Sequence, residues 1–235
     1  MSPGGSLEAA YAALHFGADA VYVGLERFSA RADAANLTPG ELDELAAWAH
    51  ALEPRRRVYV TLNTLIKSAE MPAAVEALAA AADAGADAVI VQDLGLGTMA
   101  ARHFPELRLH ASTQMAVHDR AGVETLARLG YARATLAREL TLDEVRECAA
   151  VPGIEVEVFV HGALCTCYSG LCLLSSHLVG RSGNRGRCAY LCRDAFAAAG
   201  PGSDSGRFWL SMKDLSLADA VEDLRRAGVA SLKIE

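Results

Sequence analysis

Short runs of apolar residues alternate along the chain with longer stretches in which apolar residues recur every three or four positions. The short runs are rich in β-branched side chains and are typical of strands buried in a parallel sheet. The longer stretches have the amphipathic pattern of helices that cover such a sheet. The pattern predicts strands over 20–24, 57–62, 87–92, 107–112, 133–137, 154–160 and 231–235. It predicts helices over 6–15, 39–51, 71–83, 96–104, 119–128, 141–149 and 214–226.

A phrase that begins with glycine recurs where a helix gives way to a strand. GADAVYVG at 17–24 returns as GADAVIVQ at 85–92, and weaker copies follow Gly130 and Gly228. Such a glycine ends a helix in the left-handed conformation, and the β-branched run after it forms the next strand. The phrase therefore marks the junction of a repeated βα unit. At two helix starts, Thr141 with Glu144 has the capping-box pattern, and Asp214 is placed to cap the last predicted helix.

The strict alternation of strands and helices predicts an α/β fold with a parallel sheet. This many units favours a (β/α)8 TIM-barrel-like domain over 1–235 rather than an open doubly wound sheet. No Gly-x-Gly-x-x-Gly turn follows a strand, which weakens the dinucleotide-binding alternative. The predicted order begins with a helix and ends with a strand. We therefore expect an incomplete barrel that lacks its first strand and last helix, although an open or irregular barrel would also fit. Unpaired edges would favour an oligomer or a missing C-terminal domain.

The composition is that of a folded protein without a membrane span. Of the 235 residues, 52% are hydrophobic and 22% are charged, which excludes disordered, collagen-like and low-complexity classes. The chain shows no long apolar run and no signal peptide, so we expect a cytoplasmic protein. The formal net charge of −7 argues against sequence-independent binding of nucleic acid by the whole surface, and leaves room for a local basic patch.

A segment without periodicity, placed at 161–207, interrupts the alternation and carries most of the cysteines. It follows the carboxyl end of a strand, the face where barrel enzymes place their chemistry. Clustered cysteines in a cytoplasmic protein indicate metal ligands rather than disulfides. Four of them have the spacing C-x6-C-x15-C-x3-C: Cys165, Cys172, Cys188 and Cys192.

The spacing leaves the nature of the metal open. The close pair Cys188 and Cys192 fits zinc, whereas the wider pair Cys165 and Cys172 suits a [4Fe–4S] cluster, and a site without metal is a third alternative. We interpret Cys167 as a packing residue, with an alternate metal ligand as the other interpretation, and Cys148, on a predicted helix, as part of the core.

Cations and polar side chains surround this segment. The segment contains four arginines: Arg181, Arg185, Arg187 and Arg193. They would either balance the charge of a thiolate-bound cluster or bind an anionic substrate. The alternative is that they only keep a surface loop solvated. Because the carboxyl ends of parallel strands share one rim of a barrel, the polar residues that follow the strands predict a ring of polar side chains that binds a ligand. Taken singly, such a residue is commonly a helix cap. The ring comprises Asn63, Gln92, Asp93, His110, Ser112, Thr113, Gln114, Arg138 and Glu139. Hydrolase motifs such as His-Glu-x-x-His and Gly-x-Ser-x-Gly do not occur.

The motifs taken together resemble the collagenase-like peptidase family, number thirty-two of the peptidases of unknown type. The resemblance covers essentially the whole chain. Its most specific parts are 161–172, 184–193 and 211–215, and it includes 3–8, 17–24, 59–64, 91–95, 110–115 and 136–140. Members of this family begin with a strand ahead of the Pro-x-Gly-Ser phrase and continue past the Lys-Ile-Glu phrase, which supports the interpretation of the chain as a fragment.

The resemblance implies two different classes of function. Some members are described as proteases, including collagen-degrading ones. Others are oxygen-independent hydroxylases that use prephenate and an iron–sulfur cluster and act on transfer RNA, ribosomal RNA or a ubiquinone precursor. We favour the hydroxylase because the four cysteines match the cluster-binding motif and no proteolytic machinery is visible. A non-catalytic chain that binds a partner through an exposed barrel edge is a third alternative.

The resemblance also suggests roles for the candidate residues. The four cysteines would hold a [4Fe–4S] cluster at the barrel mouth. Substrate binding, including the carboxylates of prephenate or a phosphate, would fall to Arg185, Arg193, Arg138 and Glu139. The acceptor would be oriented by His110, Gln114, Asn63 and His161, with His161 as the first candidate for a general acid or base. An RNA substrate would need more basic surface than this chain supplies, so we expect a missing C-terminal part to provide it.

Overall fold

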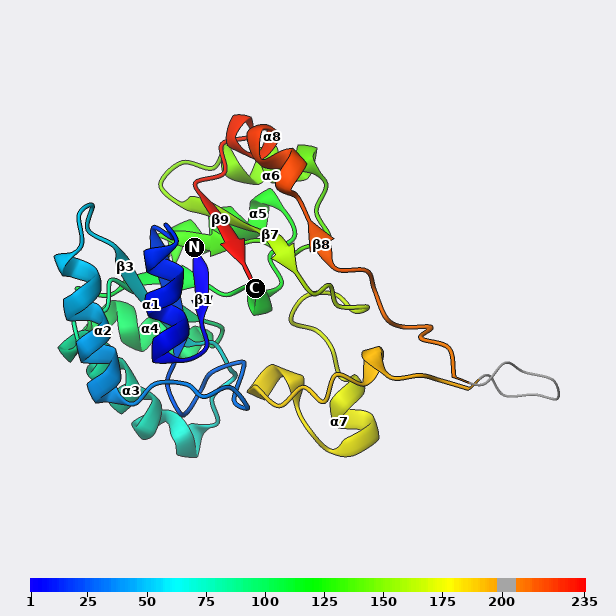
Figure 1. Cartoon of the computed structure of the whole chain (residues 1–235), viewed down its shortest axis with the longest axis horizontal. Helices are drawn as coiled ribbons and strands as arrows, with labels where there is room; N and C mark the ends of the chain where they lie inside the picture. The colour runs from blue at the N-terminus through cyan, green and yellow to red at the C-terminus, as the bar shows by residue number, and fades with distance from the viewer. Residues whose placement is uncertain (198–205) are drawn as a thin grey trace.

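A parallel sheet that curls into a TIM-barrel-like ring forms the centre of the molecule. The computed structural model describes residues 1–197 and 206–235, and the following statements refer to these. Figure 1 shows the sheet, whose order is β1-β2-β3-β4-β5-β6-β7, with β9 parallel to β7 on its far side and the short β8 antiparallel to the end of β7. The strands are β1 (Ser2–Gly4), β2 (Ala20–Gly24), β3 (Arg57–Leu62), β4 (Ala88–Val91), β5 (Arg108–Ala111), β6 (Arg133–Thr135), β7 (Glu155–Gly162), β8 (Leu215–Ser216) and β9 (Ser231–Ile234).

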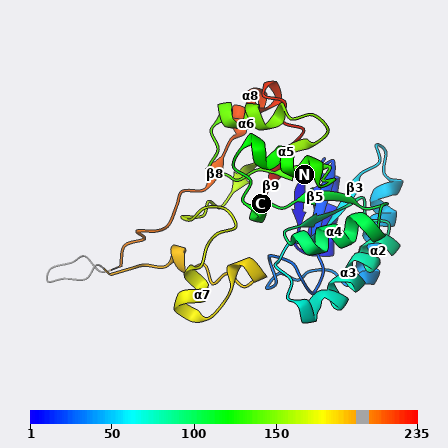
Figure 2. The same cartoon turned by 180° about the vertical axis from the view of Figure 1, so that it is seen from behind.

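Helices pack against the outside of these strands and bury the main hydrophobic core between the two layers. Figure 2 shows the same arrangement from behind. The outer helices are α1 (Leu7–His15), α2 (Pro39–Ala51), α3 (Met71–Asp83), α4 (Leu94–His103), α5 (Arg120–Arg128), α6 (Leu142–Ala149) and α8 (Val221–Arg226). The short α7 (Leu174–Val179) lies in the cysteine-bearing segment. None of the helices in the described ranges is long and apolar enough to cross a membrane.

The βα junctions form as the glycine phrase predicts. Gly17, Gly85, Gly130 and Gly228 all have positive φ, between 71° and 99°, which is the left-handed region that glycine enters without a steric penalty. The capping box at the start of α6 is also confirmed, since the Thr141 hydroxyl accepts from the Glu144 amide and the Glu144 carboxylate accepts from the Thr141 amide. The local pattern alone therefore fixes where these elements begin and end.

The prediction that the first strand is missing is wrong. Residues Ser2–Gly4 form β1 and pair in parallel with Val21–Val23 of β2. The Met1 ammonium donates to the carbonyl of Leu232 at 2.8 Å, and the Ile234 amide donates to the carbonyl of Met1 at 3.1 Å. The two sides of the curled sheet therefore meet at Met1, and the exposed edge expected of an incomplete barrel is covered there.

The predicted helix over 214–226 is also partly wrong. Leu215 and Ser216 form β8 and pair with the end of β7, and α8 begins only at Val221. Asp214 caps no helix, because its carboxylate accepts a hydrogen bond from Arg193 at 3.2 Å. Pairing with β7 and the ion pair with Arg193 are tertiary interactions, and here they override the local capping signal.

The inside of the barrel is unusually polar. Strand residues that alternate with those facing the helices form a small apolar cluster of Ala20, Tyr59, Ala88 and Ile90. Beside it, the fully buried Glu157 carboxylate contacts several polar groups from neighbouring strands. These are the Arg133 guanidinium at 3.4 Å, the Lys233 ammonium at 3.6 Å, the Thr135 hydroxyl at 3.0 Å and the Ser231 hydroxyl at 2.7 Å. Glu157 therefore pairs with two buried cations, of which Arg133 has a second carboxylate partner in Glu155 at 2.6 Å.

Candidate active site

The segment between β7 and β8 leaves the carboxyl end of the barrel and folds back onto the loops that follow β2 and β3. It is drawn in yellow to orange in Figure 1. The Ala32 amide donates to the carbonyl of Gly186 at 3.3 Å, and Arg185 binds both carboxylate oxygens of Glu70 at 2.6 and 3.0 Å. The Arg185 guanidinium lowers the pKa of Glu70 to about 2, so this ion pair persists at neutral pH. The predicted insertion was placed at 161–207, whereas β7 continues through Gly162 and the next strand, β8, begins at Leu215. Residues 198–205 of the insertion lie outside the described residues.

Two glycines allow this close docking. Gly186 has φ +77° and Gly170 has φ +78°, and both lie against backbone of the barrel loops. A Cβ at Gly186 would lie 2.2 Å from the Ser29 carbonyl oxygen, and one at Gly170 would lie 2.2 Å from the Gln114 carbonyl oxygen. Because the obstacle is backbone, any side chain at either position would push the segment away from the barrel mouth.

We therefore expect Gly186→Ala to loosen the docked segment. Gly180→Ala is the matched control, because Gly180 also has a positive φ of +66° but open space around it. The control is expected to cost about 1 kcal/mol for the left-handed backbone, and Gly186→Ala about 2 kcal/mol more for the overlap. The measurement is hydrogen exchange of the Ala32 amide, which should lose protection in Gly186→Ala alone. Equal protection in both variants would contradict the docking role of Gly186.

The cysteines of the segment influence one another electrostatically. Part of Cys165 is exposed, yet neighbouring atoms desolvate its thiol; this burial raises its pKa, and Cys192 and Cys188 raise it further. Burial likewise raises the pKa of Cys192, with Cys188 and Cys172 adding to it. Each of the four predicted ligands therefore lies close enough to at least one other of them to influence its charge.

The two remaining cysteines differ from each other. Cys148 is fully buried in α6, which confirms its placement in the core. Cys167, which we interpreted as a packing residue, is half-buried, and burial together with a hydrogen bond to Cys172 raises its pKa. Cys167 is therefore a fifth thiol in the same neighbourhood.

Cysteine thiolates are suitable ligands for a metal centre. In this structure, however, the cysteine side chains do not point toward a common metal position. Among the described residues, no three Cys, His, Asp or Glu side chains are positioned to hold a metal ion. However, the sulfur of Cys188 accepts from the Tyr190 amide at 3.4 Å and faces the Ser175 hydroxyl at 3.9 Å. Hydrogen bonds of this kind stabilise cluster-bound thiolates. The residues therefore fit a thiolate-bound centre, provided that the thiols turn toward a common point when it is loaded.

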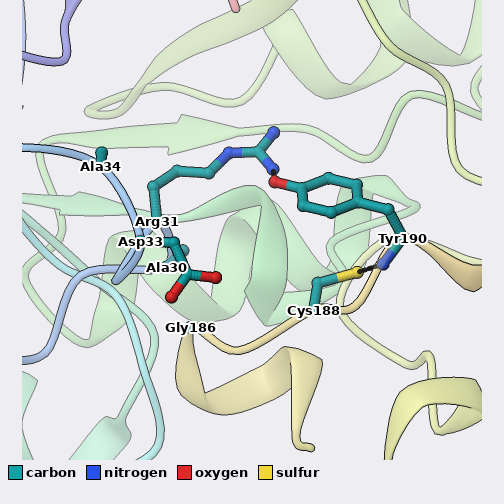
Figure 3. A pocket seen from close by; sticks show the side chains of 7 residues that line it. All are labelled: Ala30, Arg31, Asp33, Ala34, Gly186, Cys188 and Tyr190. Carbon is teal, nitrogen blue, oxygen red and sulfur yellow. Dashed lines mark hydrogen bonds between the residues drawn. The ribbon is translucent and has the colours of Figure 1, made fainter.

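Two pockets flank the cysteines. The larger, of about 230 Å³, lies between the loop after β2 and the segment. Figure 3 shows Arg31 reaching across it to the hydroxyl of Tyr190, next to Cys188. The second, of about 160 Å³, is lined by Arg138, Glu139, Leu164, Cys165, Ser169 and Met212. Each pocket therefore combines an arginine with one of the predicted cysteine ligands.

The candidate residues Arg138 and Glu139 meet the segment directly. The Arg138 guanidinium donates to the carbonyl of Ala163, stacks 3.9 Å from the ring centroid of Phe159, and contacts the Glu235 carboxylate at 2.6 Å. The Glu139 carboxylate accepts from the Ser169 amide at 2.7 Å and from its hydroxyl at 3.2 Å. Both residues therefore lie at the rim, beside Cys165, where their strand-end position predicts them.

The candidate arginines of the segment are engaged within the chain. Arg185 binds Glu70, and it also donates to the Leu65 carbonyl at 2.8 Å. Arg193 donates to the Leu164 carbonyl and to Asp214, both at 3.2 Å, and so ties the two arms of the segment together. These contacts hold the segment in shape. A substrate-binding role for either arginine stays a prediction and would require these contacts to open.

The four residues predicted to orient an acceptor are not gathered at one place. His110 is buried inside the barrel, with its ring centroid 4.8 Å from that of Tyr59, and burial holds its pKa well below the usual value. Asn63 accepts from the Ala30 amide at 2.9 Å, which supports the loop that lines the larger pocket. Gln114 accepts at its backbone from Gln92 and lies under Gly170. His161 is exposed at the end of β7.

Sequence reasoning missed three residues at the rim: Arg31, Tyr190 and Glu235. Arg31 and Tyr190 lie in loops without periodicity, so only the folded segment brings them together. Glu235 directly follows β9, and the same strand-end rule that identified Arg138 would have identified it.

Comparison with known proteins agrees with these observations. The profile of Peptidase family U32 matches residues 5–235. Over the whole chain, the sequence is 35% identical to tRNA hydroxylation protein P1 of Bacillus subtilis and 37% identical to the 23S rRNA 5-hydroxycytidine C2501 synthase of Escherichia coli. A collagenase of Porphyromonas gingivalis is 32% identical. The chain spans 57%, 36% and 60% of these relatives, respectively.

A solved structure shows the same fold. The structure of a U32 peptidase superposes with a TM-score of 0.64 over 99% of this chain and 90% of its own, at 15% sequence identity. The family profile covers nearly every residue that builds the barrel, the cysteine-bearing segment and the two pockets. The chain belongs to Peptidase family U32.

Proposed function

We propose that this chain carries the active site of an oxygen-independent RNA hydroxylase that depends on an iron–sulfur cluster and uses prephenate. The observation that carries the proposal is the neighbourhood of Cys165, Cys172, Cys188 and Cys192 at the barrel mouth, with an arginine-lined pocket on each side. The similarity of the whole chain to parts of proteins named for tRNA and rRNA hydroxylation supports an RNA substrate. Because the chain spans only part of those relatives, further RNA contacts would come from sequence outside it.

The chain's own residues would position the reactants. The four cysteines would hold a [4Fe–4S] cluster, which supplies one-electron chemistry when bound. Arg138 would present its guanidinium to an anionic group in the smaller pocket, next to Cys165. Glu139 would keep Ser169 in place through two hydrogen bonds and so fix the wall of that pocket. The docked segment would keep bulk water from the pocket beside Cys188.

The experiment that tests this proposal is RNA hydroxylation by anaerobically purified protein. Unmodified tRNA and rRNA are incubated with prephenate, and nucleoside mass spectrometry detects the gain of one oxygen atom. We expect the gain only when prephenate and protein with visible iron–sulfur absorption are both present. Hydroxylation that is unchanged after removal of the iron, or absent from all RNA tested with loaded protein, would contradict the proposal.

Peptidase activity is the second candidate, since one relative is named a collagenase. It predicts cleavage of denatured collagen by protein that contains no iron. Incubating the same preparation with denatured collagen distinguishes the two candidates, because only a peptidase releases new amino termini.

A further inference from the structure

Two arginines from distant parts of the chain hold one carboxylate at the barrel mouth. Arg31 lies in the loop after β2, Arg138 follows β6, and Glu235 follows β9. The Arg31 guanidinium binds Oε1 of Glu235, and the Arg138 guanidinium binds Oε2 at 2.6 Å. Each carboxylate oxygen therefore contacts its own guanidinium, and such charge-assisted contacts are stronger than neutral hydrogen bonds.

The surroundings of this pair are those of a binding site rather than of a surface ion pair. The side chain of Arg138 is only 11% exposed and stacks on Phe159, whose other neighbour is the Lys233 ammonium at 5.2 Å from the ring centroid. In the described part of the chain, the buried Nε of Arg138 has no hydrogen-bond partner. A buried N–H group without an acceptor lowers the stability of the fold, unless a ligand or a water molecule accepts its hydrogen bond. Oε2 of Glu235 likewise has no hydrogen-bond partner among the described residues, so both a donor and an acceptor of this pair are left unused.

The position of the pair connects it to the cysteines. Arg31 lines the pocket that contains Cys188, as Figure 3 shows, and Arg138 lines the pocket that contains Cys165. A carboxylate held between the two arginines would therefore lie between the two arms of the cysteine segment. Arg185 and Arg193, the arginines first expected to bind an anion, are already engaged by Glu70 and by Asp214.

We propose that Arg31 and Arg138 form the carboxylate-binding site for a small carboxylic acid, and that the Glu235 side chain occupies this site when the acid is absent. Exchange of one carboxylate for another leaves the charge of the site unchanged, so it carries no cost of burying an unpaired ion. This inference rests on the proposed function for the identity of the acid as the co-substrate. The binding itself requires neither RNA nor turnover.

The test is binding of prephenate, with malonate as a plain dicarboxylate, measured by isothermal titration calorimetry on the whole chain without RNA. We expect Arg31→Gln and Arg138→Gln to weaken prephenate binding by about ten-fold or more, because each removes one of the two cations that contact the bound carboxylate. Glu235→Gln should tighten binding by about five-fold, since the amide competes less well for the arginines. Arg225→Gln on α8, an exposed residue paired with Glu222, is the control and should bind as the wild type does.

Several results would overturn the proposal. Prephenate binding that is equal in wild type, Arg31→Gln and Arg138→Gln would show that the three residues only brace the barrel mouth. If the Glu235→Gln variant binds prephenate no better than wild type does, the same conclusion follows. This variant also tests the proposal if an arginine variant fails to fold. No binding of either acid by wild type would also overturn it. Because RNA is absent, failure of RNA hydroxylation leaves these outcomes unaffected, and the two proposals fail separately.

Discussion

Cys188→Ala is expected to abolish both the visible absorption of the anaerobically purified protein and its RNA hydroxylation. Cys188 lines the larger pocket, and its sulfur accepts hydrogen bonds that stabilise a thiolate. In the proposed function Cys188 is one of four ligands, and its removal would leave the cluster open to solvent and to loss of iron. We expect hydroxylation to fall by at least about a hundred-fold, since even residues that only support a metal ligand cost 10- to 100-fold. Absorption spectra and nucleoside mass spectrometry measure the two effects.

The control for this prediction is Cys148→Ala. Cys148 is buried in α6, away from the segment, so its replacement should lower stability slightly and leave the absorption and the hydroxylation in place. If Cys188→Ala retained hydroxylation while Cys148→Ala behaved as expected, the assignment of Cys188 as a ligand would be wrong. Loss of activity in both variants would point instead to a general loss of folding.

Glu157→Gln is expected to lower the free energy of unfolding by about 3–5 kcal/mol, the cost of leaving the buried Lys233 ammonium without its carboxylate partner, since Arg133 keeps its ion pair with Glu155. The Glu157 carboxylate is the shared partner of the Arg133 and Lys233 cations inside the barrel. The amide has nearly the same shape, so the change removes charge rather than volume. Urea denaturation measures the effect as a shift of the midpoint at constant slope.

An exposed ion pair provides the matched control for this change. Glu222→Gln on α8 removes a carboxylate that pairs with Arg225 and Arg226 at the surface, and such pairs contribute at most about 1 kcal/mol. A loss below about 1 kcal/mol in Glu157→Gln would show that the buried cations find other compensation, and that the polar interior does not depend on this carboxylate.

The strands and helices of the barrel were largely predictable because apolar strands alternate with amphipathic helices, and four of the junctions carry a glycine of positive φ. The strand β1 was missed because Ser2–Gly4 contains a single proline, a glycine and no apolar run, and its pairing with β2 is visible only in three dimensions. The start of α8 was placed too early for the same reason, because β7 captures residues 215–216 as a strand.

The site was predictable only in part. The spacing of the cysteines and the strand-end positions of Arg138 and Glu139 follow from the sequence, because both depend on short-range order. The partnerships of Arg31 with Tyr190 and of Arg185 with Glu70 join residues more than a hundred positions apart. They depend on how the irregular segment folds back onto the barrel loops, and no periodicity encodes that path.

The most direct test of the central claim is the iron and acid-labile sulfide content of the anaerobically purified chain. Four thiolates that share one [4Fe–4S] cluster predict about four iron and four sulfide per chain, lost together in Cys188→Ala. One zinc per chain with no sulfide, or the full iron content retained after Cys188→Ala, would contradict the claim.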